Sequence, residues 1–121
     1  MMMGQHLLIE CKGEHAALNR DALEKLMTEA AQAANATIIA SHFHTFGGHG
    51  GVTGVLMLAE SHITVHTWPE VQYAAFDIFM CGDAEPEKAA QIIANQFDNA
   101  EVSVQAINRG FNSDQTRIEQ H

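Results

Sequence analysis

A serine, a histidine and a cysteine lie close together in the sequence between residues 58 and 82, LAESHITVHTWPEVQYAAFDIFMCG. Ser61 follows Glu60, His66 comes five residues after the serine, and Cys81 comes twenty residues after it. An imidazole titrates near neutral pH and is therefore suited to moving protons. Each residue alone has an ordinary role, because serines are common in turns and histidines and cysteines in interiors. Together in one short stretch they predict a reactive site.

The strands that carry these residues decide whether they can meet. Residues 62–68 and 73–81 each have the composition of a β-strand, in which alternate side chains point to the same face. On the first strand, alternation places four residues on one face: His62, Thr64, His66 and Trp68. On the next strand it places three residues on one face: Tyr73, Asp77 and Cys81. If the two faces coincide, His66 and Cys81 can converge.

The same region resembles a known family. Four segments carry the resemblance: ESH at 60–62, HTWPE at 66–70, YAAFD at 73–77 and CG at 81–82. This string is long and specific, and it is similar to that of the prokaryotic S-adenosylmethionine decarboxylases. The resemblance implies that the chain is a proenzyme that cuts itself between Glu60 and Ser61. Ser61 would then become an amino-terminal pyruvoyl group, the cofactor of this family.

The chemistry of that family explains why these residue types are needed. Decarboxylation next to an amine leaves a carbanion, and a ketone made from the chain supplies an electron sink that ordinary side chains lack. By resemblance, Cys81 is the acid that reprotonates the carbon, and His66 is the base that removes a proton during self-cleavage. Thr53 matches a position where relatives often carry a serine that assists processing.

Two further residues match substrate-binding positions of the family. Phe46 matches the aromatic residue that stacks on adenine, and Glu70 matches the glutamate that holds the ribose hydroxyls. Trp68 is instead interpreted as core or interface packing. The expected reaction removes CO2 from S-adenosylmethionine for polyamine synthesis. Two alternatives stay open: a pyruvoyl-dependent decarboxylase of the same fold acting on arginine or ornithine, and an unprocessed, non-catalytic homologue that binds a metabolite.

Hydrophobic periodicity predicts six strands and two helices around this site. The strands are expected near residues 7–9, 37–46, 52–59, 62–68, 73–81 and 102–106. One helix is expected over residues 21–34, where Asp21 and Glu24 have the spacing of a capping box, and the other over 86–97. The predicted fold class is an α/β two-layer sandwich, in which an antiparallel sheet has both helices packed on one face.

The composition limits the classes of function. With 121 residues, 46% of them hydrophobic, residues 1–121 are expected to form a single domain. A formal charge of −9 would repel nucleic acid. No apolar run is long enough to span a membrane or to act as a signal peptide, so we expect a cytoplasmic protein. We expect its substrate to be a small molecule. The resemblance implies a homodimer of cleaved protomers with active sites between them.

Eight histidines raise the question of a metal site. His42 and His44 share a predicted strand face, as do His62 and His66. The sequence nevertheless has no H-E-x-x-H motif and no Cys/His cluster at ligand spacing, so no metal is expected. The glycine-rich stretch 47–51 lacks the lysine and the serine or threonine of a phosphate-binding loop. It is expected to be a mobile loop that acts as a flap.

Overall fold

The part of the chain that the computed structural model describes, residues 2–111 and 115–120, contains six strands and two α-helices. The strands are β1 (Gly4–Lys12), β2 (Ile38–Thr45), β3 (Val52–Leu58), β4 (Ser61–Trp68), β5 (Tyr73–Met80) and β6 (Glu101–Arg109). The helices are α1 (Arg20–Ala33) and α2 (Pro86–Ala94), and the short 3-10 turns are η1 (Glu14–Ala17) and η2 (Pro69–Val71).

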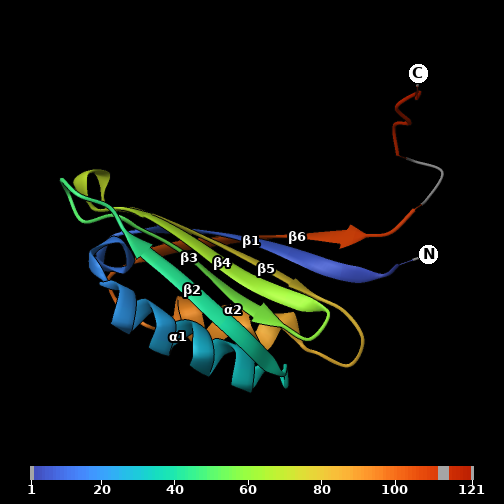
Figure 1. Cartoon of the computed structure of the whole chain (residues 1–121), viewed down its shortest axis with the longest axis horizontal. Coiled ribbons are helices and arrows are strands. Elements are labelled where there is room, and N and C mark those ends of the chain that lie inside the picture. Colours follow the sequence, from blue (N-terminus) through green and yellow to red (C-terminus); the bar gives the residue numbers. More distant parts are fainter. Residues whose placement is uncertain (1, 112–114, 121) are drawn as a thin grey trace.

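All six strands belong to one sheet, in the order β2-β3-β4-β5-β1-β6. Every neighbouring pair in the sheet is antiparallel. Both helices lie on the same side of the sheet, as Figure 1 shows. This arrangement confirms the predicted two-layer α/β sandwich.

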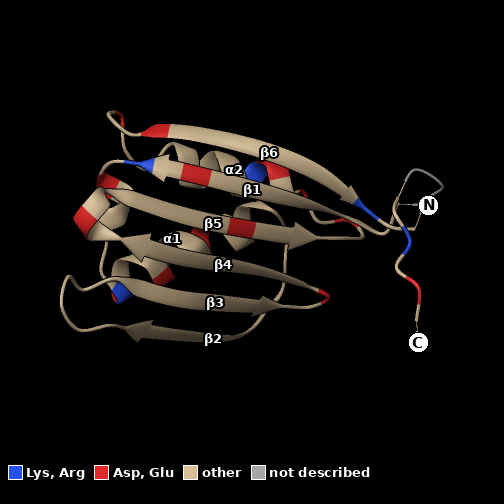
Figure 2. Ribbon diagram, turned by 90° about the horizontal axis from the view of Figure 1, so that it is seen from above, with Lys and Arg blue, Asp and Glu red and all other residues tan. Residues whose placement is uncertain are grey.

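Alternation along the strands separates a buried face from an open one. In the central strands the residues that point toward the helices are fully buried, among them Ile63 and Val65 of β4 and Phe76 and Ile78 of β5. Burying such side chains contributes about 1.5 to 3 kcal/mol each. In the described part of the chain no segment covers the opposite face, which Figure 2 shows in front of the helices. That face is called the open face below.

The start of α1 corrects one prediction. The helix begins at Arg20, and its cap is Asn19, whose side chain accepts a hydrogen bond from the backbone N–H of Ala22 at 2.9 Å. The predicted capping box of Asp21 and Glu24 does not form, because the Glu24 carboxylate accepts a hydrogen bond from the Ser41 hydroxyl of β2 instead. Neither helix of the described residues has the length and apolar character needed to cross a membrane.

Candidate active site

The predicted cleavage point lies in the tight turn between β3 and β4. Leu58 pairs with Ser61 across the hairpin, which leaves Ala59 and Glu60 as the turn residues. Glu60 is exposed and has a φ of 57°, in the left-handed region that residues other than glycine rarely adopt. Such a conformation costs on the order of 1 to 3 kcal/mol. The peptide bond that is predicted to break therefore lies in an accessible and strained turn.

Cys81 lies directly beside this turn, just after the end of β5. Its Sγ donates a hydrogen bond to the carbonyl oxygen of Glu60 at 3.1 Å. The chain's other cysteine, Cys11, is fully buried in the core, and burial raises the pKa of its thiol to about 12. Cys81 is only partly buried. Of the two thiols, only Cys81 is placed to take part in chemistry.

The remaining predicted site residues gather at the opposite end of the sheet. Thr53 of β3 pairs with His66 of β4, and Oγ1 of the threonine lies 3.1 Å from Nδ1 of the histidine, within hydrogen-bonding distance. Both residues line a pocket of about 260 Å³. Phe46 and Glu70, the predicted substrate-binding residues, line the same pocket.

Trp68 also forms a wall of this pocket, although the sequence pattern favoured a packing role for it. Its ring stacks on that of Tyr73, with 5.2 Å between the ring centroids and 16° between the planes. The Tyr73 hydroxyl donates a hydrogen bond to the carboxylate of Glu10, and this bond is the main cause that raises the pKa of Tyr73 to about 12. In the sequence, alternation along the strand places Trp68 on the same face as His66. This pattern could have indicated that Trp68 lines the same pocket as His66.

The glycine-rich stretch 47–51 closes one side of the pocket. Its base is fixed, because the Phe46 N–H donates to the carbonyl of Gly51 at 2.8 Å. A Cβ atom on Gly51 would lie 2.7 Å from the carbonyl oxygen of Thr67, so only glycine fits there. His49 is the one residue of the stretch with a side chain beyond Cα, and it lines the pocket.

The prediction that His66 and Cys81 converge within one chain is wrong. Their strand faces do coincide on the open face, but the register of β4 and β5 pairs His66 with Ala75, six residues before Cys81. Six residues of strand span about 20 Å. Ser61 is five residues from His66 along β4, a span of about 17 Å.

The site residues therefore form two groups at opposite ends of the sheet. We call them the cleavage end, consisting of Glu60, Ser61 and Cys81, and the pocket end, consisting of Phe46, Thr53, His66 and Glu70.

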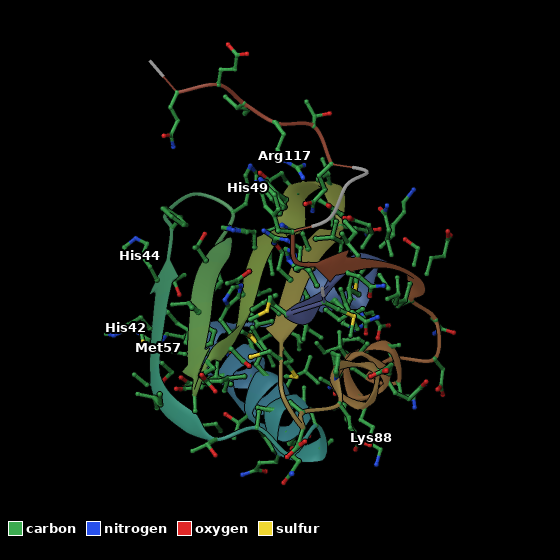
Figure 3. All side chains as sticks on the ribbon, turned by 90° about the vertical axis from the view of Figure 1, so that its right-hand side faces the viewer. His42, His44, His49, Met57, Lys88 and Arg117 are labelled. Atoms are coloured by element: carbon green, nitrogen blue, oxygen red, sulfur yellow. The ribbon has the colours of Figure 1, made fainter. Side chains whose placement is uncertain are left out.

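A polar cluster lies on the open face near the cleavage end. His6 Nε2 is 3.5 Å from Asp77 Oδ2, and the rings of His6 and His62 are 6.4 Å apart. Desolvation, with the nearby His6 as a second cause, lowers the pKa of His62. His42 and His44 project to one side of β2, away from the helices (Figure 3). Among the described residues, no group of three or more histidine, cysteine or acidic side chains is arranged to hold a metal ion.

Comparison with known proteins finds relatives along almost the whole chain. The family model described as S-adenosylmethionine decarboxylase matches residues 5–110. The S-adenosylmethionine decarboxylase proenzyme of Thermodesulfovibrio yellowstonii is 43% identical over 112 residues, which cover 90% of this chain and 82% of that protein. The corresponding proenzyme of Acetivibrio thermocellus is 36% identical over 119 residues, which cover 96% of this chain and 95% of that protein.

A solved structure agrees with these sequence matches. The crystal structure of the adenosylmethionine decarboxylase from Aquifex aeolicus VF5 matches with a TM-score of 0.76 and 31% sequence identity. The match covers 97% of this chain and 98% of that one. With a family model over residues 5–110 and relatives of similar length, the chain belongs to the S-adenosylmethionine decarboxylase family.

Proposed function

We propose that this chain is the self-cleaving proenzyme of a pyruvoyl-dependent decarboxylase that removes CO2 from S-adenosylmethionine. The observation that carries the proposal is the Cys81 thiol bound to the carbonyl of Glu60, in a left-handed turn directly before Ser61. The relatives described above are named as proenzymes of this activity. Residues 1–121 act as one domain, which cleavage divides into residues 1–60 and 61–121.

Self-cleavage begins at the Ser61 hydroxyl. Its oxygen attacks the carbonyl carbon of Glu60, the C–N bond breaks, and the hydroxyl proton passes to the freed amine, which leaves an ester. During the attack the Glu60 oxygen becomes negatively charged. The Cys81 thiol already donates to that oxygen, so it stabilises the charge as it develops. Cys81 therefore acts in cleavage as well as in the later reaction.

The second step is elimination, and it needs a base. His66 removes the α-proton of residue 61, the ester C–O bond breaks, and Glu60 leaves as a carboxylate. The unsaturated residue that remains takes up water and releases ammonia, which produces the ketone. To act as a base, His66 needs a free lone pair on Nε2. The tautomer whose Nδ1–H donates to Thr53 provides it.

His66 cannot perform this step on its own chain. A general base must come within about 3 Å of the proton that it removes, whereas His66 and Ser61 are separated by about 17 Å of strand. A second copy of the chain resolves the conflict. The open face exposes apolar side chains such as Met57 and Trp68, which are 50% and 41% exposed.

When two open faces pack about a twofold axis that runs across the strands, the pocket end of one copy lies over the cleavage end of the other. We therefore infer a homodimer of cleaved protomers with two composite sites.

The surroundings of Ser61 fit a pyruvoyl group. Such a group supplies the electron sink for the electrons that the departing carboxylate leaves behind. Ser61 is partly buried as the first residue of β4, so its pairing with Leu58 of β3 holds the new amino terminus in place. Cleavage turns the Glu60 carbonyl into a free carboxylate that is no longer joined to residue 61, and the Cys81 thiol beside it then delivers a proton to the substrate carbon.

The pocket end supplies recognition of the adenosyl part of the substrate. Phe46 is 52% exposed and offers a ring face for adenine, while Glu70 is exposed and offers two acceptor oxygens for the ribose hydroxyls. His49 and the glycine stretch close over the same pocket. A small-molecule substrate thus extends from this pocket toward residue 61 of the partner copy.

Two measurements on the purified protein test the proposal. Intact-mass analysis should find two chains of similar size in place of one 13.2 kDa chain. The processed protein should then release CO2 from S-adenosylmethionine and not from arginine or ornithine. Release from arginine or ornithine alone would overturn the substrate assignment and keep self-cleavage. An intact chain that releases CO2 from none of them would instead favour a non-catalytic binding homologue.

A further inference from the structure

In the part of the chain that the structure describes, β6 is a free edge of the sheet without a lysine, a proline or a bulge to prevent pairing. It stands last in the strand order and pairs with β1 along all nine of its residues without a register shift. Exposed edges normally carry a lysine, a proline or a bulge that prevents another strand from adding to them. The sequence of β6, EVSVQAINR, has neither lysine nor proline. The opposite edge, β2, has a register shift between Ile38 and Ala40.

The side of β6 that faces the helix layer is apolar and uncovered. Val104 is 49% exposed, although it lies on the strand face whose counterparts in β1 are buried in the core. Between α2 and β6 runs a groove of about 280 Å³, whose lining includes Leu7, Ala90, Val104 and Ala106. Exposed apolar strips of this kind mark interaction sites.

The charges on β6 make the strand complementary to itself. Glu101 lies at its start and Arg109 at its end, and Figure 2 shows the negative and positive ends of the strand. In an antiparallel pair of two β6 strands centred on Gln105, each Glu101 stands opposite the Arg109 of the other copy. The same register sets Val104 opposite Ala106, so the two apolar strips become continuous.

We propose that β6 pairs with β6 of a second copy of this chain, antiparallel and with Gln105 on the twofold axis. The pairing joins two six-stranded sheets edge to edge and satisfies backbone groups that the free edge leaves to solvent. It uses a different surface from the open face, so both contacts can form together. A particle with both contacts is a tetramer, whereas either contact alone gives a dimer.

Cysteine cross-linking tests the register directly. Gln105→Cys should give a disulfide-linked dimer under mild oxidation, because the two substituted residues face each other across the axis. Ser103→Cys is the matched control. In this register the two copies of residue 103 are offset by four residues, about 13 Å along the strand. A disulfide requires the two Cα atoms to lie within about 7 Å of each other, so this variant should not cross-link. The unsubstituted chain, oxidised in the same way, shows how much cross-linking arises through Cys81. Equal cross-linking of both variants would overturn the proposal.

Particle mass measured by light scattering gives a second test. Val104→Lys should halve the mass, because it places charge on the strip that must pair. Ile39→Lys, on the opposite edge strand and 60% exposed before substitution, should leave the mass unchanged. Glu101→Arg should weaken association, and adding Arg109→Glu should restore it. A mass that Val104→Lys leaves unchanged contradicts the proposal, whether or not the chain is cleaved or active.

Discussion

The cleavage end and the pocket end are built in different ways. At the cleavage end the pairing of β3 with β4 forms a two-residue turn, and one thiol just beyond β5 donates a hydrogen bond to it. At the pocket end side chains from β3, β4, η2 and the glycine stretch surround a cavity, and ring stacking between Trp68 and Tyr73 holds one wall. The first arrangement suits breaking a bond in the chain itself, and the second suits binding a ligand.

This difference explains how a short chain can hold both functions. A single sheet places the two ends about 17 Å apart. In the proposed homodimer the two ends meet because a second copy supplies one of them. Substitutions at the cleavage end should therefore act within one chain, whereas the loss of His66 should be repaired by a partner.

The largest effect is expected from Ser61→Ala. Without the hydroxyl no ester can form, so the variant should stay a single 13.2 kDa chain and release no CO2. Intact-mass analysis and the CO2 assay measure both results. Ser41→Ala removes a hydroxyl that donates to Glu24 of α1 and not to the turn, and this control should be cleaved normally. Cleavage of the Ser61→Ala chain would exclude the mechanism.

His66→Ala should stall cleavage at the ester, because elimination lacks its base. Hydroxylamine should then cut the trapped ester at residue 60. The difference between the two ends predicts a rescue: coexpression with Ser61→Ala should restore cleavage of the His66→Ala chain, since the partner supplies an intact His66. Mass analysis of tagged chains distinguishes the two variants. If His66 acts within its own chain, the mixture will show no cleavage.

Cys81→Ala should reduce both reactions. Cleavage should slow because the Glu60 oxygen loses its donor, and decarboxylation should fall by about two to four orders of magnitude because the acid is lost. Time courses of chain cleavage and CO2 release measure the two separately. Cys11→Ala is the matched control, since that thiol is buried in the core. Unchanged turnover in Cys81→Ala would assign the proton to another group.

Local sequence patterns predicted the strands and helices well. The errors lie where contacts between residues distant in the sequence determine the structure. Alternation and helical periodicity identified the six strands and two helices of the described residues. Most of these elements bury one face, whereas the exposed edge strands β2 and β6 were identified by their composition and alternation. The cap of α1 was wrong because Asn19 and Asp21 are equally good caps by type. The choice depends on Glu24, whose carboxylate is occupied by Ser41 from β2, and a local pattern cannot reveal that contact.

The candidate site shows the same limit. Alternation correctly placed His66 and Cys81 on one face, but it cannot give the register between strands. That register follows from the turn after β4, where η2 and Gln72, with a φ of 55°, set how β5 returns. The pocket role of Trp68 depends on its stacking with Tyr73 across the same turn, so it too required the structure.

A smaller effect is expected from Glu70→Gln at the pocket end. A charged hydrogen bond to a diol contributes about 1.5 to 3 kcal/mol, which corresponds to roughly one to two orders of magnitude in KM for S-adenosylmethionine. Cleavage should stay normal, because Glu70 takes no part in it. Steady-state kinetics and mass analysis measure the two results. Glu87→Gln on α2 serves as the control, and a fall in kcat with unchanged KM would count against ribose binding.

The smallest effect concerns a buried histidine in η1, close to the pocket end. The Gly13 N–H donates to the carbonyl of Gln72 beside the pocket, and His15 Nε2–H donates to the carbonyl of Ile93 at 2.7 Å. Its Nδ1 is buried and has no hydrogen-bond partner in the described structure. Desolvation is the main cause that lowers the pKa of His15 from its ordinary value of 6.5.

Because its pKa is lower in the folded state, His15 binds its proton more readily after unfolding. Its contribution to stability is full above about pH 6.5 and is lost as the pH falls below that value. Urea unfolding at about pH 7.5 and pH 5.5 should therefore give a smaller difference in stability for His15→Gln than for the wild type. His49→Gln, at an exposed histidine, should leave the difference unchanged. If His15→Gln and the wild type lose the same stability between the two pH values, the effect belongs to other groups. His62 would then be the first to test, because its pKa is also lowered.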